Sequence, residues 1–399
     1  MNKITAFFRH LYQAYCKEFR MVTHDQGIML FMLFLPLAYP VIYSLIYNPE
    51  LVKEVDVVVI DSDATPKSRK LTRMLDAADQ IHVLGYAANL DEAREAVNSH
   101  KAYGIIQIPE GFERKIGRGE VSPAVFYSDM SLLLRYRGFM VAATNVMQEI
   151  GGEIRTENIN RVVPLATTVV TGDLMPVNSI SMGNMRSGFD SFIMPGVLIL
   201  ILQQCILLAA GMGGGAKHEH PELLGYNPNS QKAPATFTVM LGQIFCWSTI
   251  LAIPILFLIH YVPLIFRFPM QGDLLEEVAL MVPVVLGACG MGLTYQAVVA
   301  EREQVFVTWV FSSVVFLLLS GLIWPRYDMP EIWRAVSAVC PATWGVEGFV
   351  KMNSNGASLS QIKDIYYHSW IVAGGWLVAG WMVQQWVLRR RLRKYFKPC

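Results

Sequence analysis

Six apolar stretches, each long enough to cross a bilayer as a helix, constrain this chain more than any other feature. A helix needs about 20 mainly apolar residues to cross the hydrocarbon core of a membrane. The expected spans are residues 28–47, 192–212, 237–262, 278–300, 305–324 and 370–388. Hydrophobic residues make up 53% of the chain, which is high for a soluble domain. We therefore expect an α-helical polytopic membrane protein.

The placement of Lys and Arg predicts how the spans are oriented. Cytoplasmic loops of membrane proteins carry an excess of these residues, and the richest cluster here lies in the tail, residues 389–399. We therefore expect both termini in the cytoplasm and all spans in a bacterial inner membrane. Residues 1–26 are expected to form an amphipathic helix on the cytoplasmic interface, in contact with membrane lipids. The net charge of +1 gives no basic field for a nucleic-acid partner.

Residues 48–191, between the first two spans, have the pattern of an inserted α/β domain outside the cytoplasm. Short runs rich in Val and Ile alternate with helical patterns, which predicts a small mixed or parallel sheet covered by helices. Asp61 and Asp63 follow the first strand, and paired carboxylates suit a hard cation. Such residues also cap helices. Because no further carboxylate cluster accompanies them, we favour capping and expect no metal site.

The segment from Gly211 to Lys217 superficially resembles a phosphate-binding loop. In such a loop the Lys follows Gly directly, between a strand and a helix. Here Ala216 separates Gly215 from Lys217, and the segment follows a span. We expect no nucleotide binding, no cofactor and no enzymatic activity in this chain, so that any ATP-driven role requires a separate ATPase.

The spans contain few ionisable residues. Ion-coupled transporters place such groups at mid-membrane depth, so this absence argues against a secondary transporter. Gln203 and Gln204 are the most polar side chains near mid-depth. They could line a substrate path, or they could form hydrogen bonds between helices.

The chain resembles the permease subunits of ABC-2-type exporters, in the subgroup with a large domain after the first span. The order of elements carries the resemblance over nearly the whole chain. Local sequence adds to it at residues 57–63, 68–71, 103–112, 320–325, 329–333 and 340–343. The segments after the fifth span are the most specific.

The resemblance implies a dimer with a second permease copy or a close paralogue, and cytoplasmic ABC ATPase subunits that carry ATP and Mg. In a double-membrane bacterium it also implies a periplasmic adaptor. The loop 213–236 would dock on the ATPase, and the loop before the fifth span is a second candidate contact, although a solvated charged turn explains it equally well. The candidate coupling residues are Lys217, His218, Glu219, His220, Glu222, Glu301, Arg302 and Glu303.

Residues 325–369 are expected to fold as short broken helices that dip into the outer leaflet, because proline interrupts a continuous helix. An ordinary amphipathic loop is the alternative. The resemblance implies that this region closes the outer end of the path. The candidate gate residues are Ser320, Gly321, Pro325, Pro330 and Pro341.

Two functions follow from these features. The first is export of an amphipathic or lipid-like substrate with ATP hydrolysed by partner subunits. The second is a membrane-anchored scaffold or sensor whose outer α/β domain binds a partner. A single anchor helix would serve the second function, so the number of spans favours the first.

Overall fold

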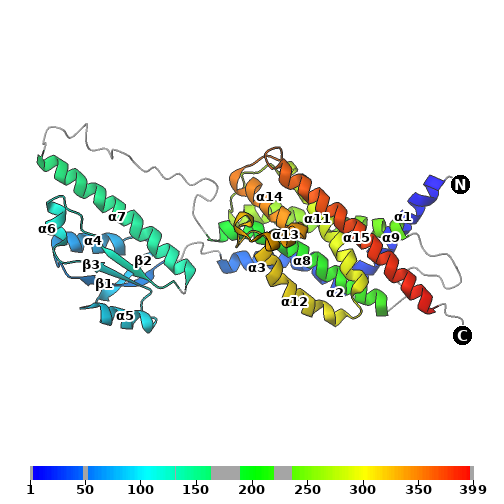
Figure 1. Cartoon of the computed structure of the whole chain (residues 1–399), viewed down its shortest axis with the longest axis horizontal. Coiled ribbons are helices and arrows are strands. Elements are labelled where there is room, and N and C mark those ends of the chain that lie inside the picture. Colours follow the sequence, from blue (N-terminus) through cyan, green and yellow to red (C-terminus); the bar gives the residue numbers. More distant parts are fainter. Residues whose placement is uncertain (1–2, 48–52, 131, 163–188, 220–235, 396–399) are drawn as a thin grey trace. The chain divides into compact units, whose positions relative to one another are not determined.

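The computed structural model describes residues 3–47, 53–130, 132–162, 189–219 and 236–395 (Figure 1). The chain divides into two compact units. A helical unit comprises Met1–Asn48 and Ser181–Cys399, and a second unit comprises Pro49–Ile180. Within the described residues, five helical segments are long and apolar enough to cross a membrane. The protein is therefore a helical membrane protein.

The helical unit begins with α1 (Lys3–His24) and contains the five candidate spans. They are α2, η1 and α3 (Gln26–Met29, Leu30–Phe34 and Leu35–Tyr47), α8 (Phe189–Glu219), α9, η3 and α10 (Thr236–Leu256, Phe257–Tyr261 and Val262–Phe266), α11 (Leu274–Val298) and α12 (Arg302–Leu319). After α12 come η4 (Arg326–Asp328), α13 (Glu331–Val339), α14 (Pro341–Asn355) and α15 (Lys363–Tyr395). The π-helical turns η1 and η3 lie inside the first and third candidate spans.

The structure differs from the prediction at the fifth and sixth spans. The fifth was placed at 305–324, but α12 ends at Leu319, because Gly321 has a φ of +85° and such a left-handed residue stops a helix. The sixth, 370–388, lies within α15, which is not among the five apolar candidates. The glycines and the glutamine pair Gln384 and Gln385 make it less apolar than the others.

The second unit contains a four-stranded sheet in the order β2-β1-β3-β4. Strand β1 (Val55–Asp61) pairs in parallel with β2 (Ile81–Tyr86) and β3 (Gly104–Ile108), and β4 (Val125–Ser128) is antiparallel to β3. Four helices accompany the sheet. They are α4 (Pro66–Asp76), α5 (Leu90–Asn98), α6 (Phe112–Gly117) and α7 (Leu133–Val162).

The alternation of side chains along β1 gives the sheet two apolar faces. Val57 and Val59 pack in a cluster with residues of α4, α6 and α7, whereas Val58 and Ile60 pack with residues of α5. Successive side chains of a strand point to opposite faces, so one strand contributes to both layers. Lys67 and Lys70 of α4 also form ion pairs with glutamates of α7.

Asp61 and Asp63 are engaged at the start of α4 and α6. Asp61 accepts hydrogen bonds from the backbone N–H of Ala64 (2.9 Å) and the Ser68 hydroxyl (2.7 Å), and Asp63 accepts from the Thr65 hydroxyl (2.6 Å) and the N–H of Glu113 (2.9 Å). Burial alone would raise the pKa of Asp63, but these hydrogen bonds outweigh it and hold the pKa below its usual value. The two carboxylates therefore serve as caps.

Glycines allow the helices of the bundle to approach closely. A Cβ at Gly290 of α11 would lie 2.7 Å from the backbone nitrogen of Leu377 in α15, and one at Gly380 would lie 3.0 Å from the carbonyl oxygen of Gly290. Small residues of this kind hold membrane helices together by van der Waals packing. Helix α15 therefore packs against the backbone of α11.

This contact predicts opposite effects for two Gly to Ala substitutions. We expect Gly290→Ala to destabilise the helical unit by about 1–3 kcal/mol, because the added methyl group overpacks the α11–α15 contact. Gly374→Ala is the matched control in α15, because a Cβ there meets nothing within 4 Å, and we expect it to be neutral or to stabilise by about 0.5–1 kcal/mol. Thermal unfolding in detergent measures both, and equal midpoints would contradict the packing argument.

Candidate functional site

A buried carboxylate joins α1 to the spanning helices. Glu18 of α1 is 5% exposed and Lys217 at the end of α8 is 6% exposed. The Lys217 ammonium donates to both carboxylate oxygens of Glu18, at 2.9 and 3.1 Å. From α9, the Gln243 amide and the Trp247 indole N–H donate to the same carboxylate at 3.2 and 3.1 Å. Gln384 of α15 donates to Gln243 (3.4 Å), so four helices meet here.

We call Glu18, Lys217, Gln243 and Trp247 the Glu18 cluster. A buried charge is tolerated only when it is paired and its remaining hydrogen-bonding capacity is used. Glu18 fulfils both conditions, because both oxygens have two donors each. Burial also lowers the pKa of the adjacent Lys17, and the charge of Lys217 lowers it further. The cluster can hold α1 in one position, and it offers no nucleophile or metal site.

Close packing supports the same attachment. A Cβ at Gly242 of α9 would lie 2.6 Å from the Cβ of Ala14 and 3.0 Å from the backbone nitrogen of Tyr15. Helix α1 therefore lies directly against α9. The large apolar side chains Ile4, Phe8 and Tyr12 remain exposed, which suits an interface between lipid and water.

A second charged cluster lies at the same end of the bundle, around the first residue of α12. Arg302 Nη1 lies 2.9 Å from Asp25 Oδ2, and its Nε lies 3.3 Å from Glu219 Oε2. Asp25 also caps α2 by accepting from the backbone N–H groups of Gly27 (3.0 Å) and Ile28 (3.2 Å). Three chain segments that are distant in sequence therefore meet at one guanidinium group.

The first predicted coupling segment begins later in the structure than expected. The loop expected at 213–236 begins later, because α8 continues to Glu219. Lys217 is therefore not a loop residue available to a partner but a buried member of the Glu18 cluster. His218 and Glu219 occupy the last turn of α8, whereas His220 and Glu222 lie outside the described residues.

The second predicted coupling segment lies beside the first. Glu219 and Arg302 form the ion pair described above, and a Cβ at Gly215 of α8 would lie 2.9 Å from the backbone nitrogen of Arg302. Glu301 and Glu303 are exposed next to this pair. The two segments thus form one charged surface, with exposed carboxylates at the start of α12.

At the opposite end of α12, α14 is inserted among the spanning helices. The amide oxygen of Gln203 accepts a hydrogen bond from the backbone N–H of Ala342 (2.7 Å), in the first turn of α14. Its amide nitrogen also lies 3.4 Å from the sulfur of Cys340. Gln203 therefore connects α8 with the start of α14. Neither amide atom of Gln204 has a hydrogen-bond partner among the residues that the structure describes.

The candidate gate residues occupy the ends of these short elements. Ser320 directly follows α12 as its C-cap, and its hydroxyl donates to the carbonyl of Leu317 (2.7 Å). Pro325 and Pro330 directly precede η4 and α13, and Pro341 is the first residue of α14. Proline suits the first turn of a helix because its missing N–H needs no partner there.

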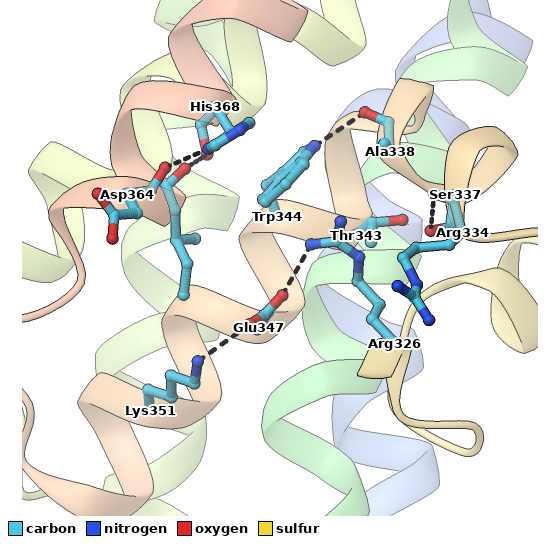
Figure 2. Close-up of polar contacts among 12 residues, drawn as sticks. Arg326, Arg334, Ser337, Ala338, Thr343, Trp344, Glu347, Lys351, Asp364 and His368 are labelled. Carbon is cyan, nitrogen blue, oxygen red and sulfur yellow. Dashed lines mark hydrogen bonds and ion pairs between the residues drawn. The ribbon is translucent and has the colours of Figure 1, made fainter. Parts of the chain in front are cut away.

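Figure 2 shows a stack of three planar side chains between these elements. The Trp344 indole lies between the His368 imidazole, at 4.6 Å between ring centroids, and the Arg326 guanidinium, whose central carbon lies 4.0 Å from the ring centroid. Glu347 pairs with Arg326 (3.0 Å) and with Lys351 (2.9 Å). This stack joins η4, α14 and α15.

Neither the Glu18 cluster nor this stack was predicted from the sequence. Glu18 is the one acidic residue in the first 24 positions of the sequence, on a helix otherwise expected to lie among lipids, and that isolation is a usable signal. Arg326 and Trp344 lie within the segment singled out by its prolines. Their contact joins residues 18 positions apart in sequence, so no local pattern indicates it.

Two comparisons with known proteins place these features in context. A family model described as ABC-2 family transporter protein matches residues 27–383. The linearmycin resistance permease protein LnrN of Bacillus subtilis (strain 168) is 21% identical over 332 residues, which cover 78% of this chain and 83% of that protein. The matched region includes α8, α9, α11, α12 and α14.

The Glu18 cluster predicts strong coupling between two substitutions. Lys217→Met or Glu18→Gln alone should destabilise the helical unit by about 3–5 kcal/mol, because each leaves a buried charge without its partner. The double variant should cost much less than the sum of the two single variants, since it leaves no buried charge unpaired and the amide oxygen of Gln can still accept from one of the two α9 donors. Thermal unfolding of the four proteins in detergent measures this coupling.

The pair of Glu347 and Lys351 provides the control, with Lys351 exposed and Glu347 half-buried and also bonded to Arg326. The same two changes there should show a coupling below about 1 kcal/mol, because an ion pair open to solvent contributes little and Glu347 keeps Arg326 as a partner when Lys351 is replaced. Additive effects of Glu18→Gln and Lys217→Met would show that the buried pair does not hold α1 in place.

Proposed function

The chain belongs to the ABC-2 family of transporter proteins, and from that premise we propose that it is the permease subunit of an exporter driven by ATP. Membership of this family implies an ABC ATPase partner. The observation that carries the proposal is the charged surface where the end of α8 meets the start of α12, because a partner ATPase needs a polar contact on spanning helices.

The coupling we propose runs through this charged surface. Glu301 and Glu303 are exposed beside Arg302, which holds α2, α8 and α12 together. An ATPase bound to these carboxylates would act on the ends of two spanning helices at once. The Glu18 cluster would transmit the same displacement to α1 and α9, because its hydrogen bonds do not permit sliding.

We further propose six spans, with α15 as the sixth. Helix α15 packs along α11 through Gly290 and Gly380, and α11 is itself a candidate span. Six crossings place both termini on one side of the membrane, and the basic tail favours the cytoplasmic side. Residues 48–191 then form an extracytoplasmic α/β domain, where an adaptor would bind.

The opposite end of the bundle would form the outer gate. Helix α14 is buried against α8 and α11, and Gln203 fixes its first turn. The stack of Arg326, Trp344 and His368 holds the short helices in place. Opening this end for release requires these contacts to separate, in a dimer with a second permease copy or a paralogue.

The expected direction is outward and the expected substrate is amphipathic or lipid-like. A permease that confers resistance moves its substrate away from the cytoplasm, and the similar protein from Bacillus subtilis is a linearmycin resistance permease. The few ionisable groups in the spans support a neutral or amphipathic substrate.

ATPase coupling tests the proposal directly. The chain should purify with an ABC ATPase from its source genome and stimulate its turnover in lipid nanodiscs. Replacing both Glu301 and Glu303 with Lys should weaken this association about tenfold, or about 1.4 kcal/mol. Glu331→Lys, an exposed change at the start of α13, is the matched control and should have no effect. A wild-type chain that binds no ABC ATPase would contradict the proposal.

The native cysteines provide a test of orientation. Cys205, Cys246, Cys289 and Cys340 are buried, and six spans place Cys16 and Cys399 in the cytoplasm. A membrane-impermeant maleimide should therefore leave the wild-type chain unlabelled in intact spheroplasts and label it after permeabilisation. Ser99→Cys, at the end of α5, should be labelled in both. Labelling of Cys399 but not of Cys16 in intact spheroplasts would establish an odd number of spans.

A further inference from the structure

A small pocket lies between α8, α11 and α12. It has a volume of about 110 Å³. The residues that matter here are Gln204 and Leu207 of α8, Tyr295 of α11, and Thr308, Trp309 and Phe316 of α12. None of its lining side chains is charged.

Four buried polar atoms of this lining have no hydrogen-bond partner in the part of the chain that the structure describes. They are both amide atoms of Gln204, the Tyr295 hydroxyl oxygen and Trp309 Nε1. Gln204 is only 7% exposed. By contrast, the Thr308 hydroxyl donates to the carbonyl of Gln304 (3.0 Å) within its own helix. The unpaired groups therefore gather in one place.

Buried polar groups without hydrogen-bond partners are energetically unfavourable. A buried donor or acceptor without a partner costs about 1–3 kcal/mol, and hydrocarbon tails offer none. Trp309 can only donate, Tyr295 can donate or accept, and Gln204 has two donor hydrogens and one acceptor oxygen. The pocket thus offers mostly donors, which an uncharged oxygen-bearing group satisfies.

We propose that this pocket binds the uncharged, oxygen-bearing end of an amphipathic molecule. A hydroxyl or ester group would bond with Gln204, Tyr295 and Trp309. The hydrocarbon part would lie along α12, whose candidate span is only 11% buried and carries exposed apolar side chains such as Phe311 and Val314. A formal charge on the ligand is disfavoured, because the lining holds no counter-charge.

The size of the pocket supports binding of one end only. Pockets that enclose a drug-sized molecule have volumes of about 300–1,000 Å³, several times the volume found here. An alcohol or ester headgroup fits, and the remainder of the molecule must stay outside. The exposed apolar surface of α12 can contact the hydrocarbon part of the ligand without enclosing it inside the protein.

Photolabelling with three matched probes tests the inference on the purified full chain, without any ATPase. The probes share a twelve-carbon chain with a diazirine and end in a hydroxyl, a trimethylammonium or a methyl group. The alcohol should label peptides containing Gln204 and Trp309 about tenfold more than the other two, since only the alcohol pairs with the unpaired groups without bringing in a charge. Equal labelling by all three would overturn the proposal.

Two conservative variants and a matched control sharpen the test. Tyr295→Phe and Gln204→Leu should each lower labelling by the alcohol about fivefold, because each removes hydrogen-bonding capacity that the ligand uses. Thr308→Val removes a hydroxyl from the same lining, but that hydroxyl is already bonded within α12, so labelling should persist. Labelling of Tyr295→Phe at the wild-type level would contradict the role of the unpaired groups.

A competition arm identifies the source of the natural ligand. Dioleoylglycerol is a neutral lipid with ester and hydroxyl oxygens, and its displacement of the alcohol would identify a membrane lipid as the occupant. If it does not displace the probe and the alcohol raises the turnover of the partner ATPase, the occupant is cargo. The assignment of the occupant as cargo rests on the proposed function, because it uses ATPase turnover. Photolabelling in the absence of the ATPase does not rest on it, so the pocket proposal and the proposed function can fail separately.

Discussion

The carboxylate of Glu18 is the interaction on which one end of the helical unit depends. It lies on α1, which is not one of the candidate spans, and it accepts all its hydrogen bonds from α8 and α9. Apolar surfaces can slide past each other at little cost, but a buried carboxylate cannot leave its donors without a large penalty. Any displacement of α1 must therefore carry Lys217 and Trp247 with it. The helix is attached to the bundle, not only adsorbed beside it.

Helix α8 connects this attachment with the opposite end of the unit. It runs without interruption from Phe189 to Glu219 and is the most buried of the candidate spans, at 83%. Lys217 lies in its last turn, and Gln203 holds the first turn of α14 about four helical turns away. Glycines fix its neighbours at short range, since a Cβ at Gly196 would lie 2.7 Å from Leu322 and one at Gly214 would lie 2.5 Å from a backbone oxygen of α11. One rigid helix therefore carries contacts to both ends.

Apolar length alone located the five candidate spans, with ends that lie up to seven residues from the predicted ones, because crossing a bilayer depends on composition and length and not on specific contacts. Features that depend on contacts between residues distant in the sequence were not predicted. Lys217 follows a glycine-rich stretch and resembles a loop residue, and its partner Glu18 is 199 positions away. The end of α12 at Leu319 depends on the φ of Gly321, while the apolar sequence continues to Trp324. The ABC-2 resemblance, which rests on the order of elements and on local sequence, is confirmed by the family match.

The adjacent residues Gln203 and Gln204 have different environments, and this difference links stability with the proposed binding. Neighbours on a helix point about 100° apart, so one amide faces α14 and the other faces the pocket bounded by α11 and α12. Gln203 stabilises the start of α14, because its amide oxygen accepts a hydrogen bond there. A partner for Gln204 within the chain would add stability, but it would remove the hydrogen-bonding capacity that a ligand needs. Departures from complete pairing concentrate at functional sites for this reason, and the unpaired amide is best explained by a partner that comes from the membrane.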